Sequence, residues 1–330
     1  MSSTDKRRSY GFLNRGVWTW AIWDWGSAAF NAVVTTFVFA TYLANDKLFG
    51  PDANSLLGWV LAAAGIFVAL TAPAVGQWTD RSGKRNTSLT IATIGVVIIM
   101  ALLFFVKPDG GGFYMWLGLI LLALGNIIFE TGSVVYNSMV TDVSTPKTVG
   151  RVSGFGWGMG YVGGIVLLAI LYVGFIAPEV GWFGVTSKDG QNIRVSMIIA
   201  AIWFLISALP LMITGKNRPP VGDQTSGIVE AYKQVIRSLV RFWREDRSVV
   251  WFLISSAIYR DGLAGVFSFG GVLAAAAFGF SPGQVLIFGI AANVVAGIAT
   301  IVFGRMDDKL GSRAVIVLSL VLMVVSGMVI

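Results

Sequence analysis

The chain contains no cysteine and no histidine. Without cysteine it can hold neither a disulfide framework nor a thiolate metal site. The absence of histidine excludes imidazole metal ligands, His-based proton relays and Ser-His-Asp catalysis. Any proton chemistry must therefore use Asp, Glu, Lys, Tyr or water. Walker loops, haem ligand sets and protease motifs are also missing, which argues against an ATP-driven pump, a redox complex and an intramembrane hydrolase. We therefore expect a protein without metal or cofactor that is not an enzyme.

Charged residues are scarce as well. They make up 12% of the 330 residues, whereas 55% are hydrophobic, and the mean hydropathy is +0.76. An ordinary globular domain carries about 25% charged residues. A soluble protein of this composition would expose large apolar patches, so the sequence predicts an all-α polytopic membrane protein.

Nine apolar stretches approach or exceed the length of about 20 residues that a membrane span needs. Segments rich in Pro and Gly, such as Gly50-Pro51-Asp52, separate them. We predict a tail at 1–16, a six-helix bundle at 17–214, a cytoplasmic linker at 215–247 and a partial second bundle of three spans at 248–330. The predicted spans are 17–43, 54–78, 87–106, 113–141, 151–177, 195–214, 248–278, 283–303 and 314–330.

The basic residues predict the orientation, because Lys and Arg concentrate in cytoplasmic loops. With the N-terminal tail inside, 19 of the 24 Lys and Arg lie in inside segments and four lie outside. The remaining one, Arg260, lies within a span. This asymmetry accounts for the net charge of +7 without nucleic acid as a partner.

The linker contains a predicted amphipathic helix. Its apolar residues recur at helical spacing, and basic residues surround them. We interpret it as a helix on the anionic inner leaflet, with a plain linker helix as the alternative. The apolar set is Ile228, Tyr232, Val235, Leu239 and Phe242, and the basic set is Lys233, Arg237, Arg241 and Arg244.

One basic turn, Gly76–Arg85, occurs again between two later apolar runs, at Gly304–Arg313. Such an echo indicates an internally duplicated membrane protein, and an ordinary basic loop is the alternative for either copy alone. The matched pairs are Gly76 with Gly304, Asp80 with Asp308, Arg81 with Lys309, Gly83 with Gly311 and Arg85 with Arg313. The second copy has one span after it, so the layout resembles a six-plus-six carrier cut short, with an intact nine-span protein as the other possibility.

Ionisable residues inside spans are costly and are therefore functional candidates. Asp24, Glu130 and the pair Arg260-Asp261 lie roughly 14, 16 and 20 Å deep at 1.5 Å per residue. Asp24 and Asp261 each fall in the first span of their half. Each acid could equally serve a structural ion pair or a hydrogen bond between helices. Arg260 and Asp261 are neighbours that point about 100° apart, so Arg260 could hold an anion or a carboxylate from the other half.

Neutral polar residues within the spans could bind a substrate or, more commonly, join helices by hydrogen bonds. They are Asn31, Asn126, Tyr136, Asn137 and Asn293. The fifth span contains a G-x-G-x-x-G match that fails as a dinucleotide site, because no strand precedes it. Its residues Gly156, Gly160 and Gly164 form instead a small-residue stripe for close helix packing.

Several motifs resemble a known family. The duplicated turn is similar to the signature of the major facilitator superfamily between spans two and three and between spans eight and nine. The segments 23–30, 136–139 with 150–158, and 261–271 resemble the UMF1 branch, which is related to the Atg22-like vacuole effluxers. The resemblance implies twelve spans, alternating access and amino acids as the best-known substrates. It also implies that the Asp80 turn holds the cytoplasmic side closed through a later helix, which the nine predicted spans do not include.

The function predicted from these features is secondary active transport of a small solute by alternating access, with proton coupling through Asp24 or Glu130. The partners expected are the solute, the lipid bilayer and protons, and we expect a monomer in a prokaryotic inner membrane with a cytoplasmic N-terminus. One alternative is a non-transporting receptor or assembly protein of carrier ancestry. A membrane-embedded enzyme would need a catalytic cluster at one membrane face, and the sequence shows none.

Overall fold

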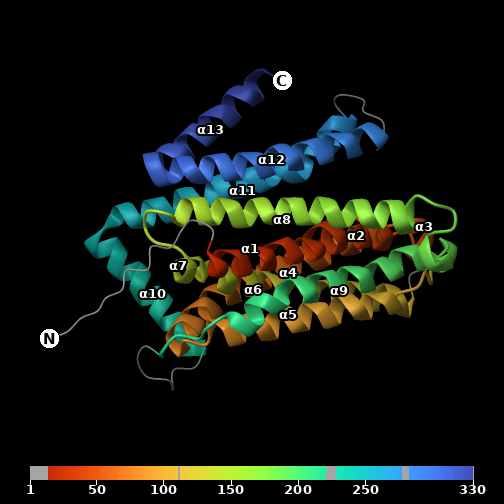
Figure 1. The fold of residues 1–330 in the computed structure, drawn as a ribbon, viewed down its shortest axis with the longest axis horizontal. Coiled ribbons are helices and arrows are strands. Elements are labelled where there is room, and N and C mark those ends of the chain that lie inside the picture. The colour runs from red at the N-terminus through yellow and green to blue at the C-terminus, as the bar shows by residue number, and fades with distance from the viewer. Residues whose placement is uncertain (1–13, 111, 221–227, 277–281, 330) are drawn as a thin grey trace.

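A computed structural model describes residues 14–110, 112–220, 228–276 and 282–329 (Figure 1). Apart from one isolated β-bridge between Val180 and Thr186, every regular element in these ranges is helical. The first half contains α1 (Arg15–Ala28), η1 (Ala29–Phe37), α2 (Phe39–Leu43), α3 (Asp46–Phe49), α4 (Ala53–Ser82), α5 (Arg85–Leu102), η2 (Leu103–Phe105), α6 (Phe113–Ser138), α7 (Val140–Val143), α8 (Val149–Leu171), η3 (Tyr172–Ile176), η4 (Trp182–Gly184), η5 (Lys188–Gly190) and α9 (Gln191–Thr214). The remainder contains α10 (Ile228–Glu245), α11 (Arg247–Ala276), α12 (Pro282–Leu310) and α13 (Ser312–Val329).

Six helical segments among the described residues are long and apolar enough to cross a membrane. They match the first six predicted spans, and most extend a few residues beyond the apolar runs because a helix continues until a turn residue stops it. The segments are Arg15–Leu43, Ala53–Ser82, Arg85–Phe105, Phe113–Val143, Val149–Ile176 and Lys188–Thr214. The last three predicted spans fall on α11, α12 and α13, and the count of nine spans out of twelve stays a prediction.

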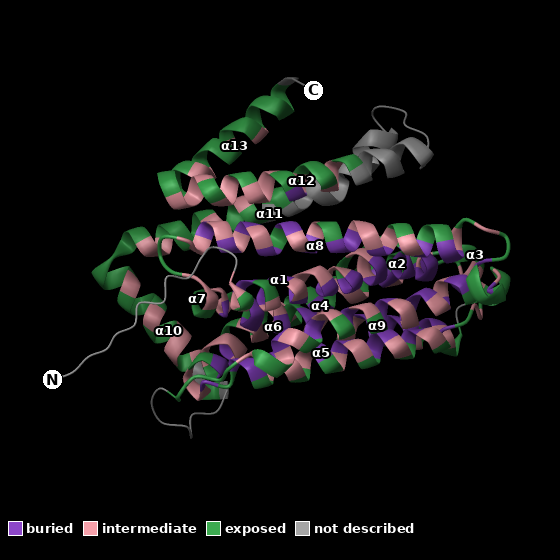
Figure 2. Cartoon of the chain, viewed as in Figure 1, coloured by how far each residue is buried: buried purple, intermediate pink, exposed green. Residues whose placement is uncertain are grey.

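The six spans pack as a bundle of roughly parallel rods, with the first span at its centre (Figure 2). Trp20 and Trp23 of α1 are buried, and their rings stack on Tyr136 of α6 at 4.6 and 4.3 Å. Such aromatic pairs add to the apolar area they bury. The indole of Trp23 also donates a hydrogen bond to Thr93 Oγ1 of α5 (3.0 Å), so α1 is fixed against two neighbours at once.

The helices of the second half lie along one side of this bundle (Figure 1). Helix α12 runs beside α8, α11 lies next to α12, and α13 turns away from them. Helix α10 crosses the end of the bundle at which α1 begins, and it connects α9 to α11 across that end. Helix α8 therefore lies between the two halves, and its two sides must fit different neighbours.

Candidate substrate pathway and cytoplasmic gate

Helix α8 packs against α1 through the predicted glycine stripe. A Cβ atom on Gly160 would lie 2.7 Å from Asp24 Oδ2, and one on Gly164 would lie 3.3 Å from the Cβ of Ala28. At Gly156 an added Cβ would overlap the ring of Trp20. These glycines let α1 and α8 approach more closely than any larger residue would allow.

A second glycine stripe on α8 faces α12. A Cβ on Gly150 would lie 2.7 Å from the carbonyl oxygen of Gly304, and one on Gly158 would lie 2.8 Å from Ile301 Cγ1. At Gly154 it would overlap the carbonyl of Thr300. The sequence reasoning missed this stripe, although its four-residue spacing is as regular as that of the first. Contact with both halves explains why α8 is so rich in glycine.

Asp308, in the second copy of the repeated turn, binds the first turn of α8. Its carboxylate accepts hydrogen bonds from the backbone N–H groups of Gly150 (2.8 Å) and Arg151 (3.1 Å), and from Arg151 Nε (2.7 Å). The Asp308 side chain is 5% exposed. A carboxylate at a helix N-terminus satisfies unpaired N–H groups and complements the helix dipole. The second half is therefore joined to the first by a charge-assisted contact.

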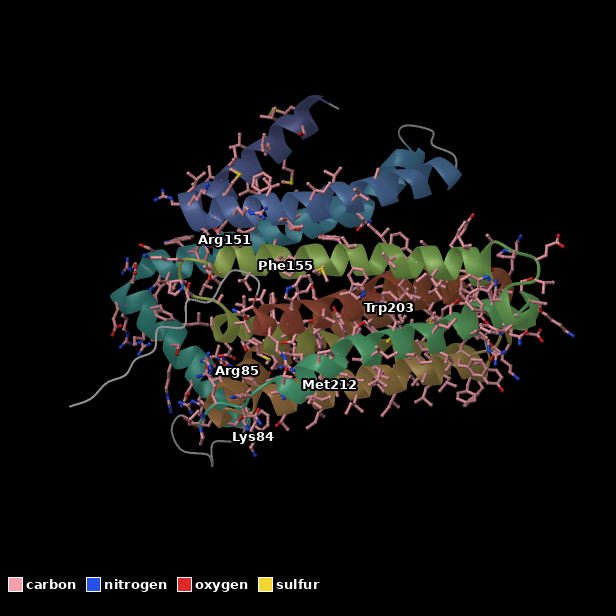
Figure 3. The ribbon with its side chains drawn as sticks, in the orientation of Figure 1. Lys84, Arg85, Arg151, Phe155, Trp203 and Met212 are labelled. Atoms are coloured by element: carbon pink, nitrogen blue, oxygen red, sulfur yellow. The ribbon has the colours of Figure 1, made fainter. Side chains whose placement is uncertain are left out.

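The first copy of the turn makes its contacts within the first half. Asp80 pairs with Arg85 (2.6 Å), and Arg85 also approaches Asp142 after α6 (3.6 Å). Arg218, at the start of the linker, pairs with Asp142 and donates its backbone N–H to the carbonyl of Gly83 (2.8 Å). Figure 3 shows Arg85 and Arg151 at the same end of the molecule, on opposite sides of the bundle.

Sequence reasoning did not select Asp142, Arg151 or Arg218 as site residues. The available signal was their position, because each lies within a few residues of a predicted span boundary on the inside of the membrane. Ion pairs between such boundaries depend on which helix ends meet in space. The pattern along the chain therefore cannot pair them.

Asp24 lies between α1 and α8 at the level of Gly160. Within the described part of the structure its carboxylate accepts a hydrogen bond from Ser27 Oγ (3.1 Å) and forms no ion pair. An ionised carboxylate without a cation is strongly disfavoured away from water. The geometry therefore suits either a protonated acid or a bound cationic group at this position.

Glu130 lies on the side of α6 that its neighbours leave open. On this helix Gly125 and Phe129 face η1, where both meet the ring of Phe30, and Val134 faces Gly76 of α4. At 100° per residue, Glu130 points between those two directions. Asn126 and Asn137 point the same way, and both Glu130 and Asn137 are exposed. These three predicted polar residues therefore share one face of α6, whereas Tyr136 faces α1.

The other predicted site residues have mixed surroundings. Asn31 is exposed in the π-helical segment η1, whose irregular turns are frequent at functional sites. Tyr136 is buried, and its hydroxyl donates to the carbonyl of Trp20 (3.2 Å), so it supports the α1–α6 contact. Arg260 is exposed on α11, and Asn293 is half-buried on α12. The side chain of Asp261 lies outside the described part of the structure.

Comparison with protein families identifies the chain. Residues 50–329 match the family described as vacuole effluxer Atg22 like. This chain belongs to that family. The family match covers the six-helix bundle from α4 onward together with the linker and the second half, and it includes both copies of the repeated turn.

Individual relatives agree with this assignment. The chain is 22% identical to an uncharacterized MFS-type transporter, YxiO of Bacillus subtilis, over 92% of this chain and 70% of that protein. It is 24% identical to multidrug resistance protein 2 of the same organism, over 82% of this chain and 62% of that protein. The chain thus spans about two thirds of the length of these relatives.

The solved structure of the proton:xylose symporter XylE, a major facilitator superfamily protein, resembles this fold. The match has a TM-score of 0.57 at 19% identity and covers 89% of this chain and 68% of that one. The fold is therefore that of the major facilitator superfamily. The chain is an integral membrane protein, and the predicted family resemblance is confirmed.

Proposed function

We propose that this protein is a secondary active transporter that carries a small solute by alternating access, and that the contact between Asp308 and α8 is its cytoplasmic latch. The observation that carries the proposal is the position of Asp308, a residue of the second half that binds the N-terminus of a helix in the first half. A rocking motion must break this contact to open that side. The contact is strong enough to hold a state closed and polar enough to reform.

The proposed solute site lies between the halves, on the open faces of η1 and α6. Asn31, Asn126, Glu130 and Asn137 supply polar groups there, and Asp24 supplies a carboxylate between α1 and α8. Arg260, Asp261 and Asn293 are proposed as the contribution of the second half. Family membership favours amino acids or similar small metabolites as solutes.

Proton coupling is proposed to run through Asp24 or Glu130. Neither acid has a cation partner among the described residues, so each can lose or gain a proton as its access to water changes. The charge bias of the loops supports a cytoplasmic N-terminus, and the short tail and compact loops favour a prokaryotic inner membrane. We propose the same division of the chain as the sequence predicts, with a six-helix bundle at 17–214, a cytoplasmic linker at 215–247 and a second bundle from 248. A monomer would suffice for this mechanism.

Purified protein reconstituted into liposomes would test the proposal with a solute panel led by amino acids. Asp24→Asn or Glu130→Gln should abolish uptake driven by a pH gradient while solute exchange persists. Asp52→Asn and Glu179→Gln, exposed acids outside the core, are matched controls that should behave like the wild type. Undiminished proton-driven uptake in both site variants would refute the coupling. Failure of the wild type to move any solute would favour the receptor alternative.

A further inference from the structure

Helix α10 carries an exposed apolar face. Its residues Ile236, Leu239, Val240 and Trp243 are 42–59% exposed and lie on one side of the helix at 100° per residue. Basic residues lie along one flank of this apolar face. A helix that exposes this much apolar surface beside charge is typical of the boundary between membrane and water.

Helices α10 and α11 form a shallow groove, open to the surroundings, where they join. Its volume is about 480 Å³, within the range of roughly 300–1,000 Å³ typical of small-molecule sites. Every side chain that lines it is apolar, and the lining comes from the last two turns of α10 and the first three turns of α11. The residues are Leu239, Val240, Trp243, Val250, Leu253, Ile254 and Ala257.

Two arginines that have no acidic partner among the described residues lie where the helices meet. Arg237 pairs with Glu230 (2.9 Å) and Arg241 with Glu245 (3.8 Å), whereas no described carboxylate lies within ion-pair distance of Arg244 or Arg247. The guanidinium of Arg247 lies 5.6 Å from the ring of Trp243, which itself lines the groove. Asp246, between them, accepts the backbone N–H of Ser248 (3.0 Å) and so caps α11. Positive charge therefore remains uncompensated beside an apolar groove.

The depth of the groove and of the two arginines in the membrane indicates which ligand they could bind. Val250 to Ala257 lie three to ten residues into α11 from Arg247, or roughly 5–15 Å at 1.5 Å per residue. With the basic loops inside, this is the depth of the acyl chains of the inner leaflet, and the arginines lie at the depth of its phosphates. We propose that the groove binds an acyl chain of an anionic glycerophospholipid and that Arg244 and Arg247 hold its phosphate. A protein partner would leave these charges buried or would need an acidic counterpart.

Native mass spectrometry of the purified, delipidated protein can test this site. The probes are dioleoyl phosphatidylglycerol, the neutral dioleoyl phosphatidylcholine and soluble glycerol 3-phosphate. The double variant Arg244→Gln/Arg247→Gln should weaken phosphatidylglycerol binding about 25-fold, at about fivefold for each basic side chain near an anionic lipid. The control Arg237→Gln/Arg241→Gln removes the same charge from paired positions and should change binding less than fivefold.

A groove-filling variant separates insertion of a chain from attraction at the surface. Ala257 is exposed, so Ala257→Phe should fold normally and should weaken binding of both lipids by occupying the groove. Unchanged lipid binding in this variant, equal effects of the two arginine pairs, or displacement of the lipid by millimolar glycerol 3-phosphate would each overturn the proposal. The proposal would also be overturned if the protein forms a dimer that covers the groove and if lipid binds to the monomer but not to this dimer. None of these outcomes depends on whether the protein transports a solute.

Discussion

The two copies of the repeated turn share a backbone conformation but differ in what surrounds them. Gly83 and Gly311 each take a left-handed conformation, with φ of 68° and 83°, between two helices. The largest difference lies in the exposure and the partners of the acid that precedes each glycine, Asp80 in the first copy and Asp308 in the second. The Asp80 side chain is 51% exposed and pairs with Arg85 of its own turn, whereas that of Asp308 is 5% exposed and binds α8 of the other half.

The paired glycines that begin each copy show the same contrast. A Cβ on Gly76 would lie 3.2 Å from a methyl group of Val134 in the same half, whereas one on Gly304 would lie 2.5 Å from the carbonyl of Gly150 in the other half. A duplicated motif therefore serves two purposes in this structure. The first copy fastens the linker to its bundle, and the second copy fastens the two halves together.

The largest effect is expected from enlarging the glycine contact between the halves. Gly154→Leu would force a side chain against the backbone carbonyl of Thr300, which cannot rotate away, and should cost about 3 kcal/mol or more of the α8–α12 contact. Because the chain has no cysteine, alkylation of Ile301→Cys reports separation of these helices. The rate should rise steeply in Gly154→Leu. Gly65→Leu, at an open position on α4, is the control, and a comparable rise there would contradict the prediction.

The second-largest effect is expected from neutralising the acid of each copy, and it should differ between Asp308 and Asp80. Asp308→Asn removes charge-assisted hydrogen bonds to two backbone groups and an arginine, and should cost about 2–3 kcal/mol. Asp80→Asn removes an exposed pair and should cost less than about 1 kcal/mol. Alkylation of Ile301→Cys and thermal unfolding in a mild detergent would measure both. Equal effects of the two substitutions would show that the buried contact is not the stronger.

Replacing the left-handed glycines should reveal which copy holds the linker. Gly311→Ala has open space around it and should cost about 1 kcal/mol for its backbone conformation alone. Gly83→Ala meets the same strain and also places its methyl group against the carbonyl of Arg218, so it should cost roughly 1–3 kcal/mol more. Thermal unfolding of the two variants gives the ranking. A larger loss for Gly311→Ala would contradict it.

The smallest effect is expected for the ion pair between Arg218 and Asp142. Arg218 is half exposed, so the coupling energy in a double-mutant cycle of Arg218→Gln and Asp142→Asn should be about 0.5–1 kcal/mol. Protease cleavage within the linker should accelerate modestly in each single variant. A coupling energy of zero would mean that the backbone hydrogen bond from Arg218 to Gly83 holds the linker without the side chain.

The spans of the first half could be predicted because each needs only a long apolar run, which is a local property of the chain. The duplication could be predicted because its spacing repeats within one sequence. The ion-pair partners of the charged residues could not be predicted from the sequence. Asp142, Arg151 and Arg218 are far apart along the chain, and which helix ends meet depends on how the helices pack.

The glycines of α8 show the same division. Gly156, Gly160 and Gly164 were predicted to pack closely, but the sequence did not say that α1 is their partner or that Gly150, Gly154 and Gly158 receive α12. Sequence by itself determined the membrane class, the helices of the first half, the repeated turn and the family motifs, since each depends on hydropathy or spacing along one chain. Only the tertiary structure decided that Asp80 stays at the surface while Asp308 is buried at the start of α8. Burial and hydrogen bonding depend on the neighbours that folding brings, and two similar motifs can acquire different ones.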